Sequence, residues 1–414
     1  MKTSTAFRDA ALLAAAAAST VGAASIARRA GVSACKLPAN RSAFFSPGFG
    51  VDVDCVPSTG TVNALMLFID FPDQTATESS PQELYDYFFP HATKWFDASS
   101  YGKLSLNITA DATRFLRMPK PASEYQFERG LTAELHQIYV KDALEEWLRV
   151  TNTPVPGVNS TEGPLTDILY VIPTRNATAI TFSATLTTSV YTYDVNYIAR
   201  KAVTQGFDTY DWWGNKALNH ETGHAFCLPD LYPLPTGDVG MYTGNWDMMA
   251  KVNARSPDYF AWNKWRLGWL TDDQVDCIAP ADAGAGNASS TSTHKLTPLE
   301  TAGGIKAVVV KQSERAALVA EVRAKGGADE FACTTGVLLY TVSTDKATGE
   351  GPIRVLDANP GGWGSAACAN DELDNAPLTL GGEGASSYTV EEWGVTVTVV
   401  GQDGDDYTIR VDVK

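Results

Sequence analysis

Positive charge is scarce in this chain of 414 residues. Lysine and arginine number 32 against 48 aspartates and glutamates, which gives a formal net charge of −16. A surface of this sign repels phosphate backbones and anionic lipid, so we expect no nucleic-acid partner and no basic membrane docking. Histidine is scarcer still, with five residues. A motif that uses two of them is therefore informative.

Long apolar runs are also missing beyond the N-terminus. No later segment offers the ~18 uninterrupted apolar residues that a membrane-spanning helix needs, so we expect no membrane span. Lys2 and Arg8 precede a short alanine-rich stretch that ends in small residues (10–24), which is typical of a secretory signal peptide. The sequence predicts a signal peptide over residues 1–24 and a secreted, extracellular product. The alternative is an alanine-rich N-terminal helix.

Two further features agree with export. The cysteine count is even, at six, and an even count in an exported chain favours disulfides. Proximity along the chain predicts the pairs Cys35–Cys55 and Cys333–Cys368, which leaves Cys227–Cys277. Acceptors for N-glycosylation, typical of a secreted glycoprotein, occur at Asn40, Asn107, Asn159, Asn176 and Asn287.

Apolar patterning predicts an α+β arrangement in the first two thirds of the chain. Short apolar runs at 63–71 and 167–173 predict buried strands, and alternating patterns at 104–110 and 189–195 predict two more. An amphipathic pattern predicts a helix over 132–149. Further helices are expected after Ser80, interrupted at Pro90, and over about 216–227.

Beyond about Cys277 the composition changes. Residues 281–293 are rich in Ala, Gly, Ser and Thr and predict a linker or long loop. An all-β, sandwich-like domain is predicted by short β-like runs at 307–311, 317–322, 336–342, 395–400 and 407–413. The chain is therefore divided into a signal peptide (1–24), an extended N-terminal segment (25–58), an α+β domain (59–276) and a β-rich C-terminal domain (277–414).

The segment that indicates chemistry has the spacing His-Glu-x-x-His. On a helix, residues four apart lie on one face, so His220 and His224 can present both imidazoles to one metal ion. Glu221 lies beside His220 and can reach water at that ion without ligating it. The alternative is a pair of surface histidines on a solvated helix. The remaining histidines have no such partners and are expected to be ordinary surface or core residues: His91, His136 and His294.

A tetrahedral catalytic zinc site built on these residues needs a third protein ligand and leaves the fourth position for water. Pro229 cannot continue the helix, so the chain must turn there. A turn at this point can bring Asp230 back to the metal as the third ligand.

Downstream, residues 244–250 read GNWDMMA. In the metzincin peptidases a turn that carries a methionine lies beneath the zinc ligands. Either Met248 or Met249 could be that methionine. The alternative is that both are ordinary core residues.

These segments together resemble a known family. HETGHAFCLPDLY, followed by GNWDMMA and then AWNKWRLGWL (Ala261 to Leu270), is similar to the immune inhibitor A-like metallopeptidases, family six of the metallopeptidases. TKWFDASSYGKLSL (Thr93 to Leu106), after FIDFPD, also resembles the N-terminal half of that family, so the likeness spans about residues 60–275. The tail, with GVLLYTV and DGDDYTIRVDV, resembles the β-rich region that follows the catalytic domain there.

The resemblance implies a zincin-like catalytic domain over 59–276, with a mixed sheet and an active-site helix. It implies a secreted zinc endopeptidase with one catalytic zinc, acting on protein or peptide substrates. His220, His224 and Asp230 would be the zinc ligands and Glu221 the general base. The spacing in similar sequences favours Met249 beneath the site. Calcium binding is also implied, and we expect a monomer.

The chain departs from the family in two ways. The family usually has glycine where this chain has Cys227, because the helix must end sharply there, often with positive φ. A side chain in that conformation costs about 1 kcal/mol. A disulfide from Cys227, with Cys277 as the expected partner, could hold the turn instead. The lead-in before residue 60 is short for an inhibitory propeptide, although Cys35 or Cys55 could cap the metal as a latency switch.

Other readings and roles stay open at this point. A structural zinc site would make the protein a secreted, non-catalytic glycoprotein whose β domain binds surface glycans or protein. Hydrolysis of a non-peptide substrate by the same chemistry is a third reading. Tyr242 and Tyr259 are candidate oxyanion donors by proximity in sequence. Calcium ligation and loop solvation explain three aspartates equally well: Asp208, Asp211 and Asp238.

Overall fold

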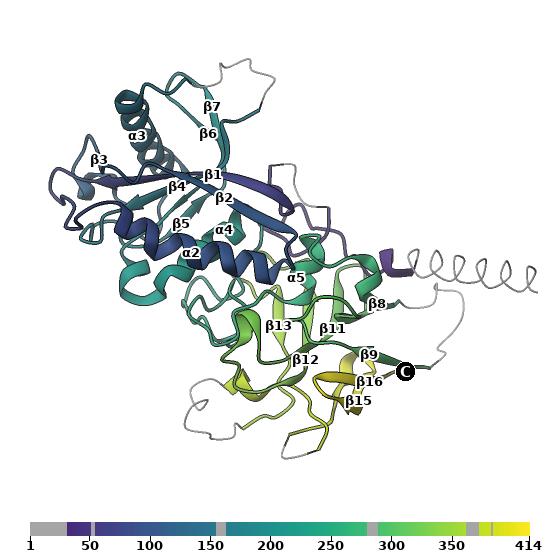
Figure 1. The fold of residues 1–414 in the computed structure, drawn as a ribbon. Helices are drawn as coiled ribbons and strands as arrows, with labels where there is room; N and C mark the ends of the chain where they lie inside the picture. The colour runs from purple at the N-terminus through teal and green to yellow at the C-terminus, as the bar shows by residue number, and fades with distance from the viewer. Residues whose placement is uncertain (1–30, 51–53, 155–162, 280–288, 362–371, 382–383) are drawn as a thin grey trace, which may run out of the picture.

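The computed structural model describes residues 31–50, 54–154, 163–279, 289–361, 372–381 and 384–414 (Figure 1). The fold is α+β, with few helices and several sheets, as the patterning predicts. Among these ranges, every helix falls short of the length and hydropathy that a transmembrane segment requires. The predicted signal peptide lies outside the described residues, as do Asn159, Asn287 and Cys368.

The first sheet holds seven strands, and its main path runs in the spatial order β2–β1–β4–β7–β5. Four of these strands are parallel, whereas β5 runs antiparallel to β7. Two short strands complete it: β3 beside β1, and β6 beside β7. The bounds are β1 (Gly60–Asp70), β2 (Leu104–Ala110), β3 (Leu116–Arg117), β4 (Thr166–Pro173), β5 (Ala184–Leu186), β6 (Val190–Tyr191) and β7 (Tyr197–Thr204).

Helices cover both faces of this sheet (Figure 1). Successive strand residues point to opposite faces, so Met66 belongs to the same apolar cluster as Phe88 of one helix, and Leu67 belongs to the same cluster as Tyr139 of another. The first face carries two helices and the second face one. The helices are α2 (Gln82–Ser99) and α4 (Ala217–Ala225) on the first face, α3 (Ala133–Thr151) on the second, and α5 (Ala261–Arg266) farther along the chain.

The predicted interruption at Pro90 is wrong, because α2 continues through it. A proline inside a helix costs about 3 kcal/mol, since it removes a hydrogen bond and crowds the preceding turn. Leu84 and Phe88 before it and Ala92 and Phe96 after it form one buried stripe against the sheet. That continuous packing outweighs the local penalty. The other predicted helices match α3 and α4, and the strand expected over 189–195 is reduced to β6.

The β-rich region consists of two sheets that enclose a common core. The first has the order β13–β12–β11–β10–β8 and the second the order β14–β15–β16–β9. All neighbouring strands are antiparallel except β8 and β10. The bounds are β8 (Val275–Ile278), β9 (Ser290–Leu296), β10 (Ala307–Lys311), β11 (Ala316–Arg323), β12 (Gly336–Ser343), β13 (Ile353–Val355), β14 (Ser387–Val390), β15 (Val395–Asp403) and β16 (Asp406–Val413).

The linker predicted over 281–293 falls largely on 280–288, outside the described residues, and its C-terminal end belongs to β9. The five-stranded sheet is buried on both faces. Val308 and Leu339 point into the core shared with the second sheet, whereas Val309 and Leu338 belong to the same apolar cluster as α2 and α4. The β-rich region and the α+β region therefore share one hydrophobic core.

A buried arginine strengthens this junction. The Arg323 guanidinium bonds to Glu321 at 2.9 Å and to Asp329 at 2.6 Å. It also donates to the backbone carbonyls of Trp246 (3.0 Å) and Ser256 (3.3 Å), which lie in the segment that follows α4. Removing one member of such a network leaves an uncompensated buried charge, so the network fixes how the two regions meet.

Two of the three predicted disulfide pairs are wrong. The structure contains Cys35–Cys277 and Cys55–Cys227, with Cα–Cα distances of 5.8 and 5.7 Å. Cys35, in the N-terminal segment (residues 31–50), lies against β8, and Cys55 lies against the end of α4, so spatial rather than sequence proximity decides the partners. Cys333 is also disulfide-bonded, and its predicted partner Cys368 lies outside the described residues. Cys35 and Cys55 are thus not available to cap a metal.

A buried histidine leads to a prediction about pH. His136 in α3 is 4% exposed, and its Nε2 lies 3.0 Å from Thr204 Oγ1. Burial lowers the pKa of His136 from 6.5 to about 3. Below pH 6.5 the unfolded chain therefore binds more protons at this residue than the folded chain does. Its contribution to stability is complete above pH 6.5 and is lost as pH falls towards 3.

We expect His136→Gln to flatten this loss, because glutamine can still bond to Thr204 but does not titrate. Between pH 6 and pH 4, the unfolding free energy of the parent should fall more steeply than that of the variant, by about 1.4 kcal/mol per pH unit. Urea unfolding at a series of pH values measures this. The same substitution at exposed His91 is the control, and equal slopes for the parent and His136→Gln would contradict the prediction.

Candidate metal centre

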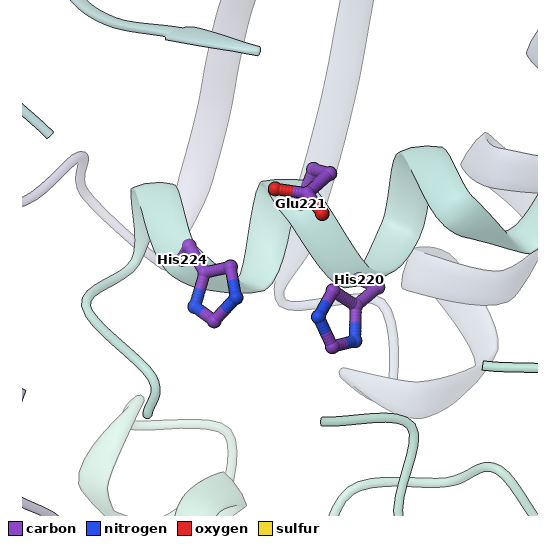
Figure 2. A group of neighbouring side chains, drawn as sticks. All are labelled: His220, Glu221 and His224. Carbon is purple, nitrogen blue, oxygen red and sulfur yellow. The ribbon is translucent and has the colours of Figure 1, made fainter. Parts of the chain in front are cut away.

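The three residues of the His-Glu-x-x-His motif lie on α4, as the spacing predicts. Figure 2 shows both imidazole rings projecting from the same side of the helix. The side chains are nearly buried, with His220 5% and His224 9% exposed. A donor atom from each of His220, Glu221 and His224 lies within 4.8 Å of the other two. The motif thus forms a compact cluster and not a pair of solvated surface histidines.

Backbone carbonyls fix the orientation of both rings. Nδ1 of His220 lies 2.8 Å from Met248 O, and Nδ1 of His224 lies 2.8 Å from Leu228 O. A carbonyl can only accept, so Nδ1 carries the proton and donates in each ring. The lone pair of each neutral imidazole is then on Nε2, which is the arrangement found in metal-ligating histidines.

Asp230 completes the cluster. The chain turns at Pro229, as predicted, and Asp230 Oδ1 lies 3.3 Å from His220 Nε2 and 3.2 Å from His224 Nε2. This oxygen is buried and has no hydrogen-bond partner among the described residues. Ligand bonds of about 2.0 Å in a tetrahedral site separate neighbouring donor atoms by about 3.3 Å. The spacing of these donor atoms therefore fits a zinc ion.

The electrostatics of the cluster favour a bound cation. Burial opposes ionisation of Asp230, but the two imidazoles outweigh it and hold the pKa of this carboxyl well below its usual range. Burial likewise opposes protonation of His224, yet the Asp230 carboxylate raises the pKa of His224 to about 9. Both shifts mean that positive charge is stabilised between these side chains. A metal ion bound there would replace protons.

Glu221 is held by a strand rather than by the histidines. Thr185 of β5 is 2.8 Å from Glu221 Oε2 and 2.7 Å from the Glu221 backbone carbonyl, and its hydroxyl can donate to either. Burial raises the pKa of Glu221 above its usual value, although the neighbouring imidazoles oppose the shift. A carboxylate with a raised pKa accepts a proton more readily. Thr185 could not be found from sequence, because nothing in a short β strand marks a contact to a helix.

Both methionines of the downstream turn contact α4, in different ways. Met248 supplies the carbonyl that orients His220. The Met249 thioether lies under Gly223, where an added Cβ would be 2.5 Å from the sulfur and 2.6 Å from the Tyr259 hydroxyl. Only glycine therefore allows the helix to approach this turn so closely. Asp247 fixes the turn by accepting from the Met249 N–H at 2.7 Å.

The cluster opens on a cavity of about 360 Å³. His220, Glu221, His224 and Asp230 all line it. Its remaining walls come from separate parts of the chain. They include Phe44 and Phe45 of the N-terminal segment, Thr185 of β5, Tyr232 after the third ligand, and Thr348 of the β12–β13 loop.

Neither tyrosine proposed from sequence as an oxyanion donor lies on this cavity. Tyr259 is buried behind α4, where its hydroxyl donates to Asn219 O at 3.4 Å. The Tyr242 ring packs against the Arg354 guanidinium at 4.1 Å. Tyr232 does line the cavity, with its ring 6.5 Å from that of His220. Burial, with Asp230 and Glu221 nearby, raises the pKa of Tyr232, so its hydroxyl remains a donor.

No family model matches this chain, and no curated protein matches it.

The structure assigns no calcium site to the three aspartates considered from the sequence. Asp208 lines the cavity and accepts from Ser183 at 2.9 Å, whereas Asp211 and Asp238 are exposed. None of the three belongs to a group of three metal-ligating side chains within the described part of the chain.

Cys227 lies two residues after the end of α4 and has the positive φ expected where the resembling family usually has glycine. Its φ is +62°, in the left-handed region that costs a side chain about 1 kcal/mol. The disulfide to Cys55, rather than to Cys277, holds this turn. Arg266 Nη2 also donates to the Cys227 carbonyl at 2.9 Å. The turn lies between the second and third metal-site residues, so its shape sets where Asp230 falls.

A pair of double variants separates the disulfide from the backbone strain. With Cys55→Ala in both, Cys227→Gly should be more stable than Cys227→Ala by about 1 kcal/mol, because glycine relieves the positive φ. Urea unfolding of the two proteins, both without added metal, measures the difference. If the alanine form is as stable as the glycine form, the turn is not strained at Cys227.

Proposed function

We propose that this protein is a secreted zinc endopeptidase. The observation behind the proposal is the convergence of three donor atoms, two of imidazole and one of carboxylate, beside a buried glutamate at a cavity. His220, His224 and Asp230 would hold the zinc. Two imidazole nitrogens and one carboxylate oxygen are a donor set typical of catalytic zinc, in which a fourth position stays open.

Zinc bound there would supply Lewis-acid polarisation of the scissile carbonyl and lower the pKa of an attacking water towards about 7. Glu221 takes the proton of that water and passes it to the nitrogen of the leaving amine. Thr185 holds Glu221 Oε2, which leaves Oε1 for the proton. Tyr232 lines the same cavity and is the candidate donor to the oxygen on which negative charge develops.

The edge of the first sheet supports a peptide substrate. β5 is the last strand on its path, and among the described strands it pairs only with β7. Ala184 and Thr185 of β5 line the cavity beside Glu221. An extended peptide can add to such an edge through main-chain hydrogen bonds. This placement favours a polypeptide over the non-peptide substrates that the same chemistry could hydrolyse.

The α+β architecture supports the proposal of a zincin-like fold. A mostly parallel sheet carries the motif helix on one face, and an antiparallel edge strand borders the cavity. Export is supported by the disulfides, which persist in oxidising compartments, and by the exposed acceptor Asn107. The non-catalytic alternative is less favoured because a structural zinc site is closed, whereas this cluster faces a cavity.

Removal of the base should separate zinc binding from catalysis. Glu221→Ala should keep zinc, because its ligands are untouched, and lose peptidase activity by at least about 100-fold. Metal analysis and digestion of casein by the purified protein measure the two properties. Glu134→Ala, at an exposed site in the first turn of α3, is the matched control. Casein cleavage by Glu221→Ala at the parent rate would refute this mechanism.

Metal removal should have a reversible effect. A zinc chelator should abolish casein cleavage by the parent protein, and addition of zinc after removal of the chelator should restore it. Circular dichroism before and after chelation checks that the chain stays folded. Undiminished cleavage by protein that metal analysis finds free of zinc would show that the activity does not depend on this site.

A further inference from the structure

The third metal-site residue is held by a loop from the β-rich region. The β12–β13 loop (residues 344–352) lies more than a hundred positions after Asp230 in the sequence, yet it bonds to that residue three times. The Asp230 N–H donates to Thr348 Oγ1 at 2.8 Å. The Thr348 hydroxyl donates in turn to Asp230 Oδ2 at 3.3 Å. The Gly349 N–H donates to the Asp230 carbonyl at 3.1 Å.

These bonds determine which carboxylate oxygen faces the histidines. With Oδ2 held by Thr348, Oδ1 is the oxygen that lies between the two Nε2 atoms, buried and without a hydrogen-bond partner among the described residues. The backbone of Asp230 is held on both sides by the same loop. Partners of this kind fix the orientation of metal-ligating carboxylates, and their loss lowers metal affinity.

The loop itself is fixed in place. Thr348 N–H donates to the Phe44 carbonyl of the N-terminal segment at 3.0 Å, and Ala347 N–H donates to Glu350 at 2.8 Å. Gly349 has φ +77°, and an added Cβ there would be 2.4 Å from Leu234, which lines the cavity. The loop therefore meets the turn after α4 in one conformation. It can act as a rigid support for Asp230.

We propose that Thr348 is a positioning residue of the metal centre, so that the β-rich region forms part of the zinc site instead of being a separate binding module. Thr348 acts on the metal through Asp230, because both hydrogen bonds of its hydroxyl go to that residue. This role rests on the proposed zinc site. It differs from the proposed peptidase activity, because it concerns how tightly the metal is held.

Zinc affinity of the full-length chain tests the role. The comparison uses the Glu221→Ala background, in which self-cleavage is absent, and competition with a colorimetric zinc chelator. Thr348→Val removes the hydroxyl and keeps the shape, and it should weaken zinc binding by about 10- to 100-fold. Thr348→Ser keeps the hydroxyl and should bind zinc close to the affinity of its parent.

Thr344→Val is the matched control. Thr344 lies in the same loop, and its buried hydroxyl has no hydrogen-bond partner among the described residues. Its replacement should leave zinc affinity unchanged. Thermal unfolding of the metal-free proteins checks that each variant folds. If Thr348→Val does not unfold cooperatively, Thr348→Ala takes its place with the same expected loss.

In the active background, Thr348→Val should lose casein cleavage at limiting zinc and recover it at saturating zinc. Zinc affinity equal to that of the parent in Thr348→Val would overturn the positioning role, and so would an equal loss in Thr344→Val. A parent that binds no zinc overturns both the role and the peptidase proposal. A parent that binds zinc but cleaves no casein overturns the peptidase proposal alone, because the measured affinities still decide the role of Thr348.

Discussion

Two imidazole nitrogens and one carboxylate oxygen meet at a single buried point, and contacts from several parts of the chain hold them there. Each group has its other polar atom tied elsewhere: His220 to the Met248 carbonyl, His224 to the Leu228 carbonyl and Asp230 to Thr348. A buried polar atom without a partner costs about 1–3 kcal/mol. Asp230 Oδ1, buried without a hydrogen-bond partner among the described residues, would gain a partner from a cation bound as we propose.

Four parts of the chain supply those contacts. The sheet supports α4 through the Tyr170 hydroxyl, which lies 2.9 Å from that of Thr222. The Met249 turn packs against the helix at Gly223, and the disulfide from Cys55 holds its end. The β12–β13 loop holds Asp230. A displacement of any of these would move one donor atom relative to the others, and metal geometry tolerates little displacement.

The β-rich region helps to position the residues of the candidate site. Its five-stranded sheet contributes one face to the core that includes α4, and buried Arg323 binds the carbonyls of the segment that follows that helix. The region therefore positions the loop that reaches Asp230. A module joined by a flexible linker could not hold a side chain to the tolerance that a metal ligand requires.

The motif residues were accessible from sequence because their geometry is local. His220 and His224 share a helix face by the helical repeat alone, and Pro229 forces a turn within reach of Asp230. Strands β2 and β4 were also predicted from the sequence, because the alternation of apolar residues and the length of an apolar run are enough to indicate a strand. The continuation of α2 through Pro90 could not be predicted from the sequence. The packing that outweighs the cost of a proline inside a helix involves strands that are distant in the chain.

The candidate metal ligands and the candidate base all lie within eleven consecutive positions, from 220 to 230, so the pattern of the chain alone was enough to propose them. Tertiary structure decided which cysteines pair, which tyrosine borders the cavity, and that Thr185 and Thr348 support Glu221 and Asp230. These contacts join residues that are tens to hundreds of positions apart. The packing of sheets and loops in space determines these partners. No periodicity or residue spacing in the sequence indicates that packing.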